Sequence, residues 1–278
     1  MAERQSPRRS CVHTPDPDDK YSPNSILNPK KLKKGRTRWN QYAEALAKID
    51  PKTLSGPMLD FGSGNGYFVM EGLKRKMNIW GVDRLPGKIK RFQDLIELTS
   101  SPHDWKNRCT VADGTDLPFP SDCFAAVSSW YVFEHIKAPG PIIRELVRVT
   151  RPGGVISIRA QDARNGWEGH CKIPWVPFLS DRLARVWIEA FGKSPELRKG
   201  VFEITQPQVI AILEALGCRI AIQAPEPRTL IKDHSRLISE RDVRRAARRI
   251  KTAFESGQWQ PQPENLYVFA QKTTPVRD

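Results

Sequence analysis

The feature that most constrains the fold is a glycine-rich turn that directly follows a short apolar segment, in Met58–Gly66 (MLDFGSGNG). The residues up to Asp60 predict a strand, and Gly62, Gly64 and Gly66 then recur at every second position. Glycines let a backbone turn sharply and approach a ligand closely, where a Cβ atom would collide. The helix predicted next points its free N–H groups at the same place. The pattern therefore indicates a strand, turn and helix that bind a nucleotide-like cofactor.

The spacing of the glycines distinguishes between kinds of cofactor. In the dinucleotide fingerprint, G-x-G-x-x-G, the third glycine comes three residues after the second. Tyr67 occupies that position here, and the third glycine comes one residue earlier, at Gly66. The spacing therefore disfavours a nicotinamide cofactor.

Short apolar runs alternate with helical patterns along most of the chain. The predicted strands are 57–61, 78–82, 109–112, 125–130, 154–158, 219–223 and 266–270. The predicted helices are 38–49, 67–76, 88–98, 141–149 and 207–216. Such alternation is typical of right-handed βαβ units. We therefore expect an α/β fold with a doubly wound, mainly parallel, seven-stranded sheet.

The rest of the chain divides around this alternation. Residues 1–35 are basic and rich in Pro and Ser, and predict a disordered N-terminal tail before a single domain over 36–278. Insertions are predicted at about 161–200 and 225–264, where such segments often form lids or substrate walls. The first contains five large aromatic residues, which favours an enclosed, apolar acceptor pocket; they are Trp167, Trp175, Phe178, Trp187 and Phe191.

Two further acids follow predicted strands, at Asp83 and Asp113. Ligands of open α/β sheets bind at the carboxyl ends of the strands, and an acid about 20 residues past the glycine turn can accept hydrogen bonds from ribose hydroxyls. Asp113 could accept one from the exocyclic amine of adenine. Each Asp could instead simply cap the next helix. With Asp60, three acids lie at predicted strand ends. Together with the glycines, these three acids favour a ligand site.

Five segments resemble, in the expected order, the class I S-adenosylmethionine-dependent methyltransferases, particularly their type 11 subgroup. They are LDFGSGNG (59–66), GVD (81–83), VADGTDLPFPSDCFAAV (111–127), FEHI (133–136) and RELVRVTRPGGVISI (144–158). The resemblance implies a Rossmann-like fold and S-adenosyl-L-methionine as cofactor. It implies that the methionine part lies among Asp60, Gly62, Gly64 and Gly66, the ribose at Asp83, the adenine at Asp113 and Gly114, and the reactive methyl beside Ser129 and Trp130.

Methyl transfer from a sulfonium mainly needs positioning and the exclusion of water. A hydroxyl acceptor also needs a base, for which histidine is the usual residue. His170, in the aromatic insertion, is the first candidate, with Glu168 as its orienting partner, and His135 is the second. Either histidine could instead have a structural role, ordering a turn or bonding to the insertion's own backbone.

Three functions remain as alternatives: methylation of a small molecule, methylation of RNA, and binding without catalysis. A small molecule, such as a metabolite, lipid or sugar methylated preferably on oxygen, fits the aromatic insertion. A net charge of +14 suggests an anionic acceptor, contact with an acidic membrane surface, or RNA. The charge is concentrated in Asn28–Arg38 and in the amphipathic Arg241–Lys251, each with six Lys or Arg residues. RNA is disfavoured because SSWYVFEH lacks an N/D-P-P-Y/F turn and no Pro-Cys pair is present. A non-catalytic binding module is disfavoured by the intact glycines and acids.

The remaining composition limits the setting. Five cysteines without a C-x-x-C pair predict neither a disulfide framework nor a metal site, and favour the cytoplasm. No apolar run approaches the roughly 20 residues of a membrane span, and the first residues lack the apolar core of a secretory signal. The sequence predicts no particular oligomeric state.

Overall fold

The computed structural model describes residues 23–225, 237, 239–258 and 265–273. Its main sheet has seven strands in the order β3-β2-β1-β4-β5-β9-β8. The pairings from β3 through β5 are parallel, and β9 runs antiparallel to both of its neighbours. The strands are β1 (Met58–Phe61), β2 (Ile79–Asp83), β3 (Cys109–Val111), β4 (Phe124–Trp130), β5 (Thr150–Ala160), β8 (Cys218–Gln223) and β9 (Leu266–Lys272). This confirms the predicted α/β fold with its mainly parallel sheet.

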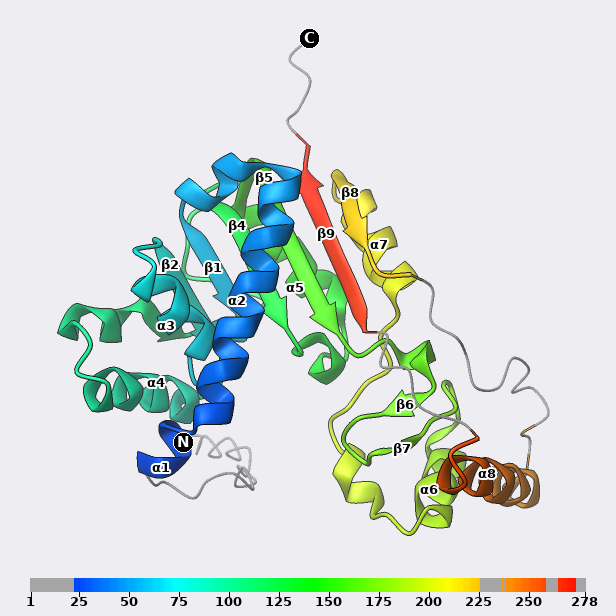
Figure 1. The fold of residues 1–278 in the computed structure, drawn as a ribbon. Coiled ribbons are helices and arrows are strands. Elements are labelled where there is room, and N and C mark those ends of the chain that lie inside the picture. The colour runs from blue at the N-terminus through cyan, green and yellow to red at the C-terminus, as the bar shows by residue number, and fades with distance from the viewer. Residues whose placement is uncertain (1–22, 226–236, 238, 259–264, 274–278) are drawn as a thin grey trace, which may run out of the picture.

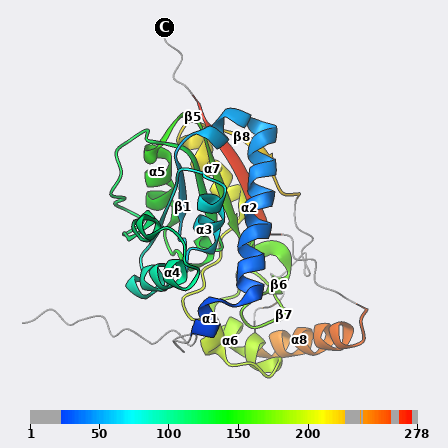
Figure 2. The ribbon, with the colours of Figure 1, turned by 60° about the vertical axis from the view of Figure 1, so that its left-hand side comes forward.

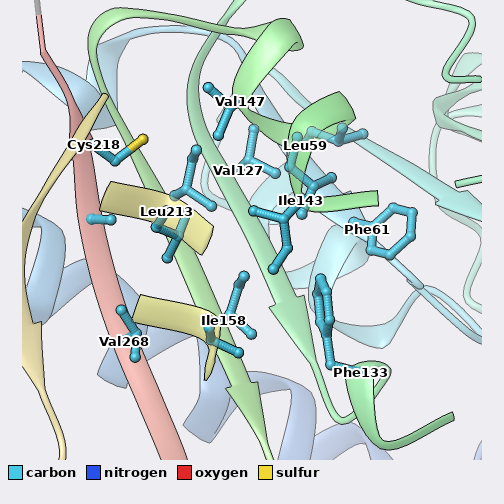
Figure 3. Packing of buried hydrophobic residues seen from close by; sticks show 14 of the residues in the cluster. Leu59, Phe61, Val127, Phe133, Ile143, Val147, Ile158, Leu213, Cys218 and Val268 are labelled. Atoms are coloured by element: carbon cyan, nitrogen blue, oxygen red, sulfur yellow. The ribbon is translucent and has the colours of Figure 1, made fainter. Parts of the chain in front are cut away.

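Helices cover both faces of the sheet (Figures 1 and 2). The α-helices of the described residues are α1 (Pro23–Ile26), α2 (Pro29–Ile49), α3 (Tyr67–Lys74), α4 (Pro86–Leu98), α5 (Pro139–Val149), α6 (Asp181–Ala190), α7 (Gln206–Ala215) and α8 (Glu240–Glu255), of which α6 and α8 lie beside the sheet and do not cover it. The first core lies between the sheet and α5 and α7, and includes Val127, Ile143 and Leu213 (Figure 3). The second lies under α2, α3 and α4 and includes Tyr42 and Phe92. All seven residues of β4 are buried because both of its faces are covered.

Helix α2 corrects the predicted N-terminal tail. Its first turn has strong start signals, since Pro29 is the first helical residue and the Asn28 side chain accepts a hydrogen bond from the Lys30 N–H at 2.9 Å. Trp39 and Tyr42 then bury the helix against the sheet. The prediction of disorder is therefore wrong for residues 23–26 and 29–35, which lie in α1 and α2, and residues 1–22 lie outside the described part of the chain.

The aromatic insertion forms a lobe beside the sheet, with the short strands β6 (Trp167–Glu168) and β7 (Ile173–Pro174) and helix α6 (Figure 1). Its two fully buried tryptophans, Trp175 and Trp187, share a core with Val243 and Ala247 of α8. The Trp187 Nε1–H also donates to the Pro174 carbonyl oxygen at 2.8 Å. The described parts of both predicted insertions therefore pack against each other.

Within the described ranges, no helix is long and apolar enough to cross a membrane. No group of three or more His, Cys, Asp or Glu side chains in those ranges is arranged to hold a metal ion. The thiols of Cys109, Cys123, Cys171 and Cys218 are free.

Candidate active site

A cavity of about 960 Å³ opens at the carboxyl ends of β1, β2 and β4, between the glycine turn and α2. Ligands of open α/β sheets bind at this edge. Most of the residues predicted to bind the cofactor line the cavity; they are Asp60, Gly62, Gly64, Asp83, Asp113, Gly114 and Trp130. Gly66 and Ser129 are not part of the lining.

The three glycines of the turn have different functions. All have positive φ angles, of 72° at Gly62, 55° at Gly64 and 70° at Gly66, which L side chains rarely adopt. A Cβ on Gly66 would lie 2.1 Å from the Phe92 ring, and one on Gly62 would lie 2.2 Å from the Val132 side chain. A Cβ on Gly64 would meet no atom within 4 Å. Gly62 and Gly66 are therefore required by packing, whereas Gly64 leaves open space for a ligand.

Asp60 is a buried carboxyl at the end of β1, with 3% of its surface exposed. Burial raises the pKa of Asp60 to about 7, although a hydrogen bond from Ser128 and the positive charge of Arg38 oppose this shift. The Ser128 hydroxyl donates to Asp60 Oδ1 at 2.9 Å. A cationic group placed in the cavity next to this carboxyl would favour its ionised form.

The backbone fixes the carboxylate of Asp83. The Gly64 N–H donates to Oδ2 at 2.9 Å, and the Leu85 N–H donates to Oδ1 at 3.0 Å. Asp83 thus joins the glycine turn to the loop before α4. Each carboxylate oxygen can accept a further hydrogen bond, so Asp83 retains the capacity to bind two hydroxyl groups.

Asp113 combines a local role with a place in the cavity lining. Its Oδ1 accepts hydrogen bonds from the Thr115 N–H and hydroxyl, both at 2.8 Å, and these bonds lower the pKa of Asp113. These local bonds fit the alternative given above, in which an Asp at a strand end simply caps the residues that follow it. They also keep an ionised acceptor at the cavity, beside Gly114.

Several buried polar atoms near the turn have no hydrogen-bond partner among the described residues. They are Ser63 Oγ, Asn65 Oδ1, Ser129 Oγ and Trp130 Nε1. Buried polar groups are normally satisfied, so the atoms of Ser63, Asn65 and Trp130, which line the cavity, call for polar partners from a ligand. Together with the open space at Gly64 and the buried carboxyl of Asp60, these atoms fit a polar, cationic cofactor.

The two histidines occupy different positions relative to the cavity. His135 lines it, whereas His170 does not, and their rings lie 5.3 Å apart between centroids. His135 Nδ1 lies 3.3 Å from the Gly200 carbonyl oxygen. A carbonyl oxygen only accepts, so Nδ1 carries the proton in this contact and Nε2 keeps its lone pair. Partial burial lowers the pKa of His135, which favours the neutral ring.

His170 belongs to a network inside the lobe. Its Nδ1 lies 2.8 Å from Glu168 Oε1, and this hydrogen bond raises the pKa of His170. Glu168 also accepts a hydrogen bond from Arg198 at 3.2 Å. Burial alone would raise the pKa of Glu168, but the hydrogen bonds from His170 and the charge of Arg198 hold it below its ordinary value. The predicted partners Glu168 and His170 are thus in contact, away from the cavity lining.

The expected aromatic wall of the cavity is not present. None of residues 161–200 lines the cavity, because the tryptophans of the insertion pack into the core of the lobe. Trp167, for example, packs against Phe254 of α8 with ring centroids 5.6 Å apart. The basic residues 241–251 of α8 do not line the cavity either.

Another wall of the cavity comes instead from α2, whose Lys31, Lys34 and Arg38 line the cavity. Sequence reasoning placed the first two of these in a disordered tail. Their spacing of three and four residues, just before the buried Trp39, is the signal that could have placed them on one face of a helix.

The strand order, the reversed β9 and the cofactor-sized cavity at the carboxyl edge are features of the class I methyltransferase fold. Residues 59–158 match the family model described as a methyltransferase domain. The chain therefore contains a class I S-adenosylmethionine-dependent methyltransferase domain, whose cofactor is S-adenosyl-L-methionine.

Among curated relatives, the chain is 28% identical to malonyl-[acyl-carrier protein] O-methyltransferase of Halorhodospira halophila over 190 residues, 64% of this chain and 62% of that protein. It is 33% identical to the chloroplastic tocopherol O-methyltransferase of Arabidopsis thaliana over 108 residues, 38% of this chain and 30% of that protein. The matches thus span less than two thirds of either relative. The structure of phosphoethanolamine N-methyltransferase 2 of Haemonchus contortus with S-adenosyl-L-methionine has a similar fold, with a TM-score of 0.52 at 18% identity, over 85% of this chain and 53% of that one.

Proposed function

We propose that this protein transfers a methyl group from S-adenosyl-L-methionine to a hydroxyl oxygen of a small-molecule acceptor. The observation that carries the proposal is the cavity of about 960 Å³, which is lined both by most of the predicted cofactor residues and by the basic residues of α2. Pockets for single small molecules commonly measure about 300–1,000 Å³, so this volume gives room for an acceptor beside the cofactor. Oxygen is favoured over nitrogen because two relatives, one of them matched over 190 residues, carry the name O-methyltransferase, against one named N-methyltransferase that is matched over 110 residues.

When bound, S-adenosyl-L-methionine supplies an electrophilic methyl group on a sulfonium. In our proposal Asp60 pairs with its ammonium group, Asp83 accepts hydrogen bonds from its ribose, and Asp113 does so from its adenine. Gly64 leaves space for close backbone approach. The glycine turn and the ends of β1, β2 and β4 then hold the donor against Trp130, where orientation supplies most of the catalysis.

His135 is the proposed general base. It lines the cavity, its Nε2 retains a lone pair, and partial burial lowers its pKa so that the ring stays neutral. With the cofactor bound, its sulfonium would supply the methyl group to the acceptor oxygen as the carbon–sulfur bond breaks, and Nε2 would take up the hydroxyl proton. S-adenosylhomocysteine and the methyl ether are the products. His170 and Glu168, which were predicted first for this chemistry, are proposed to support the position of His135 through the ring contact.

The test is to assay the purified protein for S-adenosylhomocysteine formation with separate pools of metabolites, lipids, sugars and RNA. The parent protein is expected to be active with one of the small-molecule pools and to yield a methyl ether. An Asp83→Ala variant is expected to lose this activity together with cofactor affinity. Activity with RNA alone, or cofactor binding without activity in any pool, would contradict the proposal.

A further inference from the structure

The face of α2 that lines the cavity is strongly basic. Lys31, Lys34 and Arg38 all reach the cavity and recur at three- and four-residue intervals, as residues on one face of a helix do. Gly35 lies among them, and a Cβ there would come within 2.9 Å of the Tyr67 carbonyl oxygen. Helix α2 therefore lies directly on the start of α3, and this close approach holds its basic face against the cavity.

Two aromatic rings hold the Arg38 side chain in position, but no close acid among the described residues neutralises its charge. Its guanidinium carbon lies 5.7 Å from the centroid of the Trp130 ring and 5.2 Å from that of Tyr131, which favours cation–π attraction. Burial lowers the pKa of Arg38. No hydrogen bond or ion pair joins Arg38 to another described residue. Since a guanidinium has five N–H donors and is rarely buried without partners, these donors are available to a ligand.

Further positive charge surrounds the same aromatic pair. The Arg159 guanidinium carbon lies 5.5 Å from the Trp130 ring and 5.9 Å from the Tyr131 ring. One of its nitrogens donates to Gln41 at 3.2 Å, while Nε is buried without a partner among the described residues. Arg159 lowers the pKa of Arg38, and Arg38 contributes to lowering that of Lys34. These cations therefore repel one another in the absence of an anion.

The nearby acids only partly compensate for this charge. The carboxyl groups whose charges act on Arg38 are those of Asp60 and Glu134. Burial raises the pKa of each to about 7, so near neutral pH each carries only part of a negative charge. Asp60 also faces the proposed ammonium group of the cofactor. The α2 side of the cavity is therefore positive on balance.

We infer that this face of α2 is an anion site for the methyl acceptor, in which Lys34 and Arg38 bind a carboxylate or phosphate group and place the acceptor beside Trp130. This inference rests on the proposed function, because it assigns the second ligand of the same cavity. The cofactor brings a single carboxylate, which does not match the several cations at this wall. The guanidinium of Arg38 can bind either kind of anion through two parallel hydrogen bonds.

Phenyl phosphate and its neutral counterpart benzyl alcohol can test the site by calorimetry on protein saturated with S-adenosylhomocysteine. Phenyl phosphate is expected to bind at least about tenfold more tightly than benzyl alcohol, as a charge-assisted hydrogen bond allows. Lys34→Gln and Arg38→Gln should each weaken phenyl phosphate binding about tenfold and leave benzyl alcohol binding unchanged, and Arg38→Lys should restore part of the loss. Lys34 is exposed, so its variant tests the site without disturbing the core. Arg248→Gln, on the exposed face of α8, is the matched control and should bind as the parent does.

Two results would overturn the inference. The first is equal binding of phenyl phosphate by the parent and by the Lys34 and Arg38 variants. The second is an Arg38→Gln variant that binds S-adenosylhomocysteine more weakly but keeps its affinity for phenyl phosphate and for 5′-methylthioadenosine, which lacks the amino-acid part. Arg38 would then serve the cofactor's own carboxylate. These binding results do not depend on turnover, so a failure of the proposed function, seen as no methyl transfer to any pool, is distinguishable from a failure of the anion site.

Discussion

Two alanine substitutions in the glycine turn should separate its packing function from its binding function. Gly64 and Gly66 both have positive φ angles, of 55° and 70°, and an alanine in this conformation costs roughly 1–2 kcal/mol. Gly64→Ala should lose only this amount, because its new methyl group meets no atom within 4 Å. Gly66→Ala should lose roughly 1–3 kcal/mol more, since its Cβ would lie 2.1 Å from the buried Phe92 ring.

The effects of the two substitutions on cofactor affinity should have the opposite order: Gly64→Ala should lose more affinity than Gly66→Ala. The methyl group of Gly64→Ala stands in the cavity, where overpacking against S-adenosylhomocysteine should weaken binding roughly tenfold to a hundredfold. Gly66 does not line the cavity, so the affinity loss of Gly66→Ala should be smaller once the folded fraction is taken into account. Urea unfolding of the ligand-free proteins measures the first effect, and calorimetry with S-adenosylhomocysteine measures the second.

The reasoning would be refuted by either of two results. If Gly64→Ala destabilises the protein as much as Gly66→Ala, the space at Gly64 is filled by packing. If Gly64→Ala binds S-adenosylhomocysteine as tightly as the parent, the cofactor does not approach the backbone at this turn.

Three further substitutions test separate parts of the site. Asp83→Asn should weaken S-adenosylhomocysteine binding about tenfold in calorimetry, because the amide NH₂ must face one of the N–H groups of Gly64 and Leu85; unchanged affinity would count against the ribose role. His135→Gln should lower kcat by roughly 10²–10⁴-fold while cofactor affinity stays constant, and the parent rate should fall with acidity only below the ordinary pKa of histidine, because the pKa of His135 is lowered; a flat pH profile would contradict this. Glu168→Gln should cost about 3 kcal/mol in urea unfolding at neutral pH, since it breaks a buried charge pair. The pKa of Glu168 is lowered by folding, so its stabilisation is present above the unfolded pKa and is lost as pH falls through the folded pKa; the parent and variant should converge in acid.

The sheet and the cofactor side of the cavity were predictable because their signals are local. Strand β4 was expected at 125–130 and spans Phe124–Trp130, and the glycine turn follows β1 as predicted. Asp60, Asp83 and Asp113 come together because parallel strands end at the same edge of the sheet. Periodicity and strand direction were sufficient for these inferences, and the residues' chemical roles remain predictions.

The proposed acceptor side could not be predicted, because it depends on contacts between distant parts of the chain. A basic stretch looks the same in sequence whether it faces solvent or a cavity, and the contact of Gly35 with Tyr67 decides between these environments for α2. The aromatic insertion posed the converse problem. Its composition suited a pocket wall, but Trp187 shares a buried core with Val243 of α8, which lies far along the chain.

The position of α2 means that the two ligands of the proposed enzyme are served by separate stretches of sequence. The residues proposed to bind the methyl donor lie within the family-matched residues 59–158, whereas Lys31, Lys34 and Arg38 precede that segment. Substitutions on this one helix could therefore change which compound is methylated while leaving the donor site intact. We expect that exchanging α2 between related proteins would transfer acceptor preference, provided that the glycine at its contact with α3 is retained.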